Sequence, residues 1–312
     1  MNYLIIISYD IIMVFKKKIH KRTWKRERKR IKSKFKKNIK DVMDYYKNNN
    51  NKNIKLKNSD EIIIKCNDIL VKNEKKCNKF KNGKPKKYKG KAFNNSKECD
   101  KYNKCKEHFG TYMTGHEPKY NPDLWADPII EGTHNCYAYF LNDHIPKLKT
   151  KCTHICKRKN RCKHKLNECG DFKPQPGDYA ANVGLLKKPN RIYTCPEMIH
   201  KISKDNSDIK TKKKYIFKTK FSQKCPNKYY KGAVVIEPNK TYHFYRQDNN
   251  VRYSHKQGTL RVTNVDASRK PIYAPHLSDR NYNKNKGKGI NYTKFCNYLC
   301  VPKNSYIKTN AI

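Results

Sequence analysis

The fold prediction rests on residues 133–142, which read Thr-His-Asn-Cys-Tyr-Ala-Tyr-Phe-Leu-Asn. A short polar turn ends at Asn135, and a run of aromatic and apolar residues follows it directly. This junction predicts the start of a buried helix with Cys136 in its first turn. The unpaired amides and the positive dipole end of a helix N-terminus favour the thiolate form of a cysteine. The pattern indicates a candidate nucleophile, and the alternative is a small buried apolar side chain.

The clearest strands lie downstream of Cys136 and are joined by short turns. Three extended runs follow one another at residues 232–237, 241–246 and 251–256. This arrangement predicts an antiparallel meander. Alternation along the second run places Tyr242, Phe244 and Arg246 on one face of the sheet and His243 and Tyr245 on the other.

Other segments around these strands carry local structural signals. Residues 174–178, Pro-Gln-Pro-Gly-Asp, predict a sharp turn, and residues 194–199 predict a helix entered through Pro196. Residues 260–265 predict a further extended piece. Cys296 and Cys300 would share one face of a helix, where they could bind metal or pair with other cysteines.

Three of these segments resemble parts of a known enzyme group. Asn-Cys-Tyr-Ala-Tyr at 135–139 resembles the cysteine-helix start of the compact papain-like amidases and peptidases, the NlpC-type and CHAP-type group. Residues 234–246 resemble the histidine hairpin of that group, and residues 174–178 resemble its Pro-Gly-Asp turn. The resemblance covers roughly residues 120–302. Parts of residues 243–268 also resemble a family of uncharacterised proteins from giant DNA viruses and some bacteria.

The resemblance implies an α+β fold with a papain-like core, in which a cysteine-bearing helix packs on an antiparallel sheet and a basic N-terminal extension precedes the core. It also implies that Cys136 is the nucleophile and His243 the base. The thiol needs an imidazole that accepts its proton, and the imidazole needs a polar group that holds its orientation. His255 fits the order of the group best as this orienting residue. The alternatives are Asp248, Asn264 and Asp266.

Stabilisation of an oxyanion requires hydrogen-bond donors beside the nucleophile. The backbone amide of Cys136 is one candidate donor, helped by Asn135 or Gln175. The chain departs from the enzyme group at two places: Tyr137 replaces the small residue that usually follows the cysteine, and the cysteine-rich loop after Pro146 has no counterpart. Both departures affect the substrate cleft.

Charge dominates the composition. Lys and Arg number 73 against 26 Asp and Glu, which gives a formal net charge of +47. Residues 16–40 are a nearly unbroken basic block, predicted to bind a polyanion such as DNA or RNA with low sequence specificity. The alternative is a solvated tail. The apolar run at 4–15 is too short to span a bilayer, so the sequence does not favour a membrane anchor.

Thirteen cysteines leave metal binding, disulfides and a catalytic thiol open. The densest group lies in a lysine-rich loop, and its members would suffice for one tetrahedral zinc ion. The residues of this candidate zinc site are Cys152, Cys156, Cys162, His164 and Cys169. Two local disulfides are the competing explanation, since paired Cys-x2-Cys knuckles are absent from the loop.

These observations predict a basic arm at 1–60, a lysine-rich, cysteine-containing linker region at 61–119, a papain-like domain at 120–302 with an insertion at 151–170, and a tail at 303–312. The first functional hypothesis is a cysteine hydrolase that acts on a peptide or amide through a Cys-His pair and requires no cofactor. The second is a non-catalytic, basic structural or nucleic-acid-associated protein with its cysteines in disulfides or zinc. It would be packaged in a virion or located in the cytoplasm or nucleus of an infected host cell.

Overall fold

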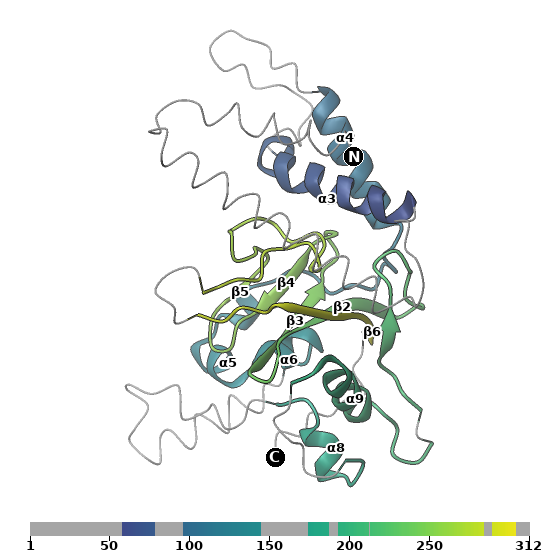
Figure 1. Cartoon of the computed structure of the whole chain (residues 1–312), viewed down its shortest axis with the longest axis vertical. Helices are drawn as coiled ribbons and strands as arrows, with labels where there is room; N and C mark the ends of the chain where they lie inside the picture. The colour runs from purple at the N-terminus through teal and green to yellow at the C-terminus, as the bar shows by residue number, and fades with distance from the viewer. Residues whose placement is uncertain are drawn as a thin grey trace. The chain divides into compact units, whose positions relative to one another are not determined.

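The computed structural model describes residues 58–78, 96–144, 174–186, 193–211, 213–283 and 289–303. All of them belong to one compact unit, Asn50–Ile312. The described part is α+β, with a six-stranded antiparallel sheet in the order β1-β6-β2-β3-β4-β5 (Figure 1). The mixed class and the antiparallel sheet agree with the sequence prediction.

The helical elements are α3 (Asn58–Cys77), α4 (Ser96–Gly110), the 3-10 turn η2 (Asp123–Trp125), α5 (Pro128–Thr133), α6 (Cys136–Phe140), α8 (Asp178–Asn182) and α9 (Cys195–Asp205). The strands are β1 (Phe217–Thr219), β2 (Tyr229–Glu237), β3 (Thr241–Gln247), β4 (Tyr253–Lys256), β5 (Val262–Thr263) and β6 (Lys294–Pro302). Within the described residues no helix has the length and apolar character needed to cross a membrane.

Helices α3 and α4 form a disulfide-linked pair in the region predicted as a linker. Disulfides Cys66–Cys105 and Cys77–Cys99 join the two helices. The pair is tied to the rest of the unit through the Tyr102 hydroxyl, 3.0 Å from that of Tyr273. Covalent links between the helices offset the weakness of a lysine-rich pair with few large apolar residues.

Strands β2, β3 and β4 form the predicted meander. In the β2–β3 ladder Gly232 pairs with Arg246 and Glu237 with Thr241, so residues 238–240 make the connecting turn. The β3–β4 ladder is much shorter, because only Arg246 and Gln247 of β3 pair with β4. The two strands therefore diverge beyond Arg246, toward the beginning of β3.

Strand β6 covers the other edge of β2 and contains Cys296 and Cys300. The two cysteines thus lie on a strand instead of a helix. Each forms a disulfide with a distant partner: Cys195–Cys296 joins α9 to β6, and Cys225–Cys300 joins the segment before β2 to β6. Pairing with other cysteines was one of the two predicted roles for these thiols.

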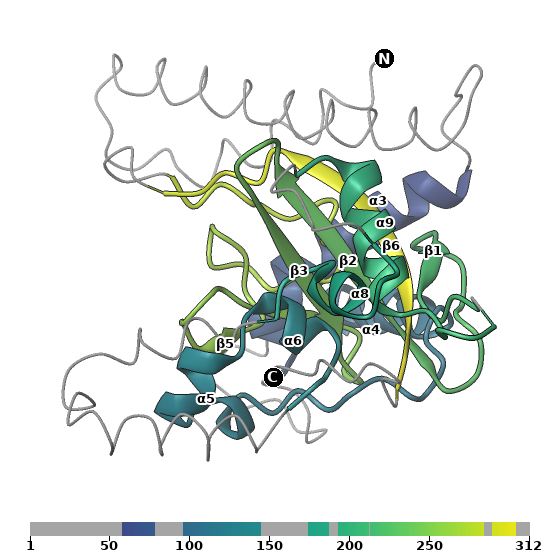
Figure 2. The ribbon, with the colours of Figure 1, turned by 90° about the horizontal axis from the view of Figure 1, so that it is seen from below.

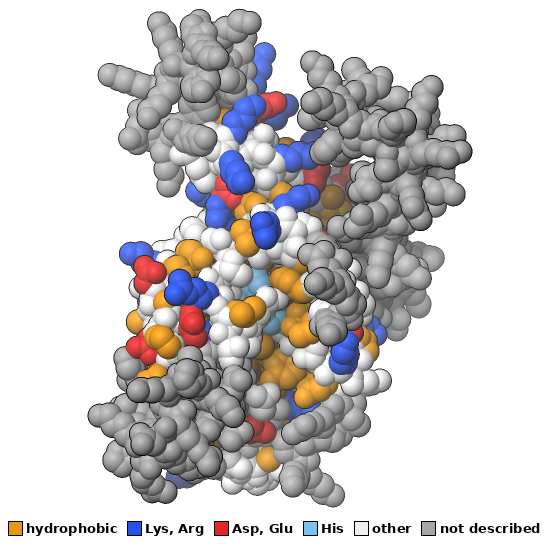
Figure 3. Space-filling view, turned by 90° about the vertical axis from the view of Figure 1, so that its left-hand side faces the viewer, with side chains coloured by type: hydrophobic (Ala, Val, Ile, Leu, Met, Phe, Trp, Pro, Cys, Tyr) orange, Lys and Arg blue, Asp and Glu red, His pale blue; other side chains and the backbone are white. Residues whose placement is uncertain are grey.

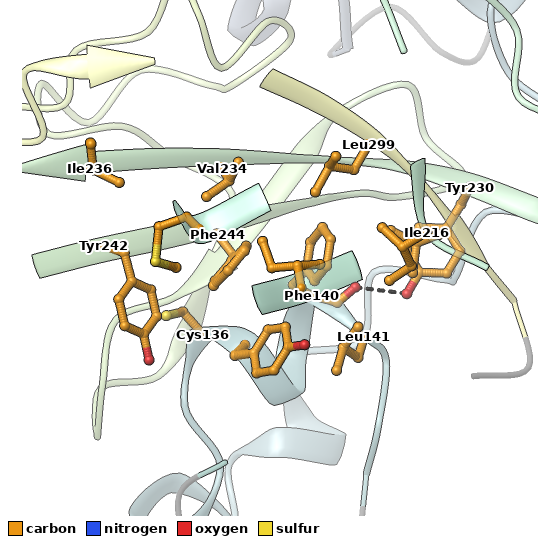
Figure 4. Packing of buried hydrophobic residues seen from close by; sticks show 14 residues of the cluster. Cys136, Phe140, Leu141, Ile216, Tyr230, Val234, Ile236, Tyr242, Phe244 and Leu299 are labelled. Atoms are coloured by element: carbon orange, nitrogen blue, oxygen red, sulfur yellow. Dashed lines mark hydrogen bonds between the residues drawn. The ribbon is translucent and has the colours of Figure 1, made fainter. Parts of the chain in front are cut away.

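One face of the sheet is covered by α6, α8 and α9 (Figures 1 and 2). The core between them is built on Phe140, which packs 4.8 Å from the ring of Phe244 (Figure 4). The Tyr230 hydroxyl donates to the Phe140 carbonyl at 2.7 Å. The absence of a side chain at Gly232 leaves room for the ring of Phe140, because a Cβ at this position would lie 2.2 Å from Phe140 Cε2. These contacts hold the short helix α6 against β2 and β3.

Candidate functional site

Cys136 is the first residue of α6, as predicted. Asn135 precedes it as N-cap, and its side-chain oxygen accepts hydrogen bonds from the amides of Tyr137 (3.0 Å) and Ala138 (3.1 Å). The other end of the Asn135 amide donates to the Pro174 carbonyl at 2.6 Å. Asn135 therefore fixes the start of the helix and ties it to the turn at 174–178. Both ends of its side chain thus take part in positioning the helix start.

The Cys136 thiol is buried and is the free cysteine of the described residues, whose other cysteines all form disulfides. Burial raises its pKa to about 12. The backbone amide of Phe244, the charge of Lys256 and the first amides of α6 act in the opposite direction. The thiol is consequently neutral at pH 7, but backbone donors converge on its sulfur from both α6 and β3.

His243 and His255 meet where β3 and β4 diverge. His243 Nε2 lies 2.8 Å from His255 Nδ1, and His255 Nε2 lies 3.0 Å from the Val265 carbonyl oxygen. A carbonyl only accepts, so His255 Nε2 carries a proton. Burial lowers the pKa of His255 to about 4 and that of His243 well below its usual value, so both rings are neutral at pH 7. His255 Nδ1 is then the acceptor, and His243 donates from Nε2.

This hydrogen-bond order assigns the lone pair of His243 to Nδ1. His243 also packs face to face on Tyr292, with ring centroids 5.1 Å apart. The structure thus brings together His243 and His255, the predicted base and the residue that fits best as its predicted orienting residue.

The side chains of Cys136 and His243 lie on opposite faces of β3. Cys136 packs with Tyr242 and Phe244 on the face covered by α6 (Figure 4). His243 alternates with these residues and points to the opposite face, as the sequence pattern predicted. Within the described residues no hydrogen bond joins the thiol to either imidazole. The thiol instead lies by the Phe244 backbone, one residue beyond His243.

Gln175 is held near the start of α6. The hydroxyl of Tyr242, whose side chain lies beside Cys136 in Figure 4, donates to the Gln175 side-chain oxygen. Gln175 is exposed, and its backbone amide donates a hydrogen bond to Asp178 Oδ2 of the same turn at 3.3 Å. The predicted oxyanion candidate therefore belongs to the same end of the molecule as the thiol.

Asp205 is a residue that the sequence did not single out. It lies at the end of α9, where its buried carboxylate accepts from the amides of Gly177 (2.6 Å) and Ala180 (3.0 Å) and from the Tyr137 hydroxyl (2.9 Å). Burial raises its pKa to about 6. Asp205 links the 174–178 turn to the residue that follows the candidate nucleophile. Gly177, with φ 97°, supplies the left-handed conformation that this turn requires.

The alternative orienting residues hold other parts of the fold. Asp248 forms a buried ion pair with Arg246 at 2.9 Å, and Arg246 stacks on the Tyr139 ring, 4.0 Å from its centroid. Asp266 accepts from the amides of residues 268, 270 and 279 and so shapes a loop. Asn264 accepts through its backbone carbonyl from the Ile272 amide at 3.1 Å.

The candidate zinc site at residues 152–169 lies outside the described residues. Among the residues that are described, no group of three or more His, Cys, Asp or Glu side chains is placed to hold a metal ion. The predicted polyanion-binding block at 16–40 also lies outside them.

The face shown in Figure 3 combines different side-chain types. Hydrophobic side chains gather along its middle with histidine among them, and basic and acidic side chains are dispersed around this band.

Comparison with known proteins gives one partial similarity. The chain is 48% identical over 48 residues to Insoluble matrix shell protein 1 of Ruditapes philippinarum, a match that covers 15% of this chain and 32% of that protein. The chain therefore spans about a third of the length of this curated relative. No family model matches the chain, and no solved structure matches it.

Proposed function

We propose that the chain is a cysteine hydrolase with a papain-like site, in which Cys136 is the nucleophile, His243 the general base and His255 the residue that orients it. The observation that carries this proposal is the hydrogen-bonded pair of imidazoles, with His243 Nε2 2.8 Å from His255 Nδ1. It commits one nitrogen of His243 to donation and leaves Nδ1 as a base.

The proposed reaction begins with neutral partners. Since burial raises the pKa of the Cys136 thiol and lowers that of His243, a resting thiolate–imidazolium pair is disfavoured. Proton transfer from Sγ to His243 Nδ1 would accompany attack of the sulfur on a carbonyl carbon. The imidazolium would then give this proton to the leaving amine or alcohol, and water would hydrolyse the thioester.

Substrate binding must bring the thiol and the imidazole within reach of each other. Hydrogen bonds in unliganded enzymes are often long or poorly aligned and shorten only in the reactive complex. Because Cys136 and His243 lie on opposite faces of β3, this approach requires a rearrangement at the beginning of β3, which pairs with β2 and has no ladder with β4. The amides of Cys136 and Phe244 would supply the oxyanion contacts.

The test is turnover of a panel of activated esters and small anilides by wild type, Cys136→Ser and Cys136→Ala. We expect hydrolysis by wild type, and a thioester adduct on Cys136 that hydroxylamine removes. Both variants should lose turnover and keep the wild-type circular dichroism spectrum. Equal turnover by wild type and Cys136→Ala would refute the nucleophile assignment.

A structural role is the second candidate, and the partial similarity to a shell matrix protein favours it. Four disulfides among the described residues fit a protein that persists in an oxidising environment, where such links resist unfolding. In this role Cys136 would be an inert core residue. Retention of the protein in an insoluble, salt-resistant fraction, together with no turnover in the panel above, would favour the structural role.

A further inference from the structure

We propose that Asn239 is an N-glycosylation site. It begins the triplet Asn239-Lys240-Thr241, which has the Asn-X-Ser/Thr pattern of the acceptor, with a residue other than proline in the middle. This inference is independent of the proposed hydrolase and does not use its residues.

The backbone presents this asparagine at the tip of a hairpin. The Lys240 amide donates to the Glu237 carbonyl at 3.0 Å and closes the turn between β2 and β3. Pro238 and Asn239 are the central residues, and Asn239 has φ 58°. Proline at the first central position and a positive φ at the second define a type II turn, in which asparagine is one of the few residues that fit. The turn thus explains the Pro-Asn dipeptide without any constraint on Lys240 or Thr241.

Exposure distinguishes this triplet from the one at 291–293. Pro238, Asn239 and Lys240 are all exposed, so a bulky, hydrated oligosaccharide on the Asn239 side chain would project into solvent. In the triplet Asn291-Tyr292-Thr293 the central tyrosine is buried against His243, and Asn291 pairs with Asn281 in a backbone bridge. Asn291 itself is half-buried, so this triplet is less accessible than the one at 239–241. In a third triplet, at 94–96, the acceptor Asn94 lies outside the described residues.

The disulfides are the second, independent observation. Cys195–Cys296 and Cys225–Cys300 close loops across sequence separations of 101 and 75 residues, and Cys66–Cys105 and Cys77–Cys99 link α3 to α4. Disulfides of this kind form where a chain folds under oxidising conditions, as in the endoplasmic reticulum, which is also the compartment in which N-glycans are transferred.

The reaction needs a lipid-linked sugar donor. The Asn239 amide nitrogen would form a bond to the anomeric carbon of an oligosaccharide carried on a polyprenyl diphosphate. The bond between this carbon and the diphosphate oxygen breaks, the lipid diphosphate leaves, and the amide loses one proton. No change of oxidation state occurs.

The position of the glycan has a structural consequence. The Asn239 backbone amide donates to the Tyr193 carbonyl at 3.3 Å, and the Tyr193 ring lies 5.4 Å from that of Tyr242, beside Cys136. A glycan at Asn239 would consequently border the end of the molecule that carries the thiol, and would shield it from large partners.

The test uses the full chain expressed through the secretory pathway of a eukaryotic cell. Asn239→Asp keeps a side chain that tolerates the positive φ, and Thr241→Ala removes the acceptor pattern while keeping Asn239. Thr241→Ser is the matched control, because it preserves the pattern. Treatment with peptide N-glycosidase in ¹⁸O water marks each occupied asparagine as labelled aspartate for peptide mapping.

We expect the label at residue 239 in wild type and Thr241→Ser, and its complete loss from that peptide in Asn239→Asp and Thr241→Ala. Secretion of disulfide-bonded wild type with no label at residue 239 would overturn the proposal, as would persistence of the label in Thr241→Ala. Label at residue 94 or 291 without label at residue 239 would also overturn it.

Discussion

Replacement of Gly232 by alanine should displace α6 from the sheet. The added Cβ would lie 2.2 Å from Cε2 and 2.6 Å from Cδ2 of Phe140, and 3.0 Å from the Tyr245 carbonyl oxygen. Real Cβ atoms do not approach other heavy atoms this closely, so the buried Phe140 ring must move. Forcing an extra methyl group into a packed core costs about 1–3 kcal/mol. We expect a loss of this size in the free energy of unfolding.

The assay is urea unfolding with all disulfides intact. Gly232→Ala should lower the midpoint at an unchanged m-value. Gly110→Ala is the matched control, because a Cβ at Gly110 meets nothing within 4 Å. It should leave stability unchanged or raise it by up to about 1 kcal/mol, since alanine favours a helix more than glycine.

A double-mutant cycle identifies the clash. Phe140→Leu removes part of the ring that Gly232 accommodates, so Gly232→Ala should cost less in the Phe140→Leu background than in wild type. Displacement of α6 should also increase the rate at which a thiol reagent modifies the buried Cys136. A Gly232→Ala protein as stable as wild type, with Cys136 equally protected, would refute the packing of α6 on β2.

Three further predictions concern the supports of the candidate site. Asp205→Asn should lower stability by about 1–3 kcal/mol, because Gly177, Ala180 and Tyr137 lose a buried acceptor; unchanged urea unfolding would contradict this. Replacement of both Cys195 and Cys296 by serine should lower the free energy of unfolding by about 4.7 kcal/mol. The same replacement of Cys77 and Cys99 should lower it by about 3.4 kcal/mol, because the loop entropy that a disulfide removes from the unfolded chain grows with sequence separation. Equal or reversed melting shifts would argue against this ranking. Acidification should destabilise the fold from about pH 6.5 down to about pH 4, since His255 has a lowered pKa of about 4 and the unfolded chain binds the extra proton in that window. Asp248, with a pKa raised to about 6, acts in the opposite direction, so His255→Gln should flatten the measured stability–pH curve relative to wild type.

The sequence predicts the parts of the fold that local patterns specify. Alternation and short turns identify β2, β3 and β4, and Asn135 followed by an apolar run identifies the start of α6. His255 could be proposed as the orienting residue because resemblance to the enzyme group fixed its order along the chain. The hydrogen bond between His243 and His255 agrees with that order.

Other features depend on contacts between distant segments. Asp205 lies within the lysine-rich stretch 201–214, which by its sequence is a charged connector, and its role exists only because α9 packs beside the 174–178 turn. The pairing of Cys296 and Cys300 depends on the path of β6, since a spacing of four residues fits a helix as well as a strand. Likewise, the face on which Cys136 lies relative to His243 follows from how α6 packs on β3.

The central claim is that His243 activates Cys136. Its most direct test is the rate at which an activated ester acylates Cys136 near pH 7, followed by intact mass, in wild type and in His243→Gln. Because general-base catalysis contributes about 10²–10⁴-fold, we expect acylation of Cys136 in wild type and a loss of this size in His243→Gln, with unchanged disulfides and circular dichroism. Equal acylation rates in the two proteins would contradict the claim.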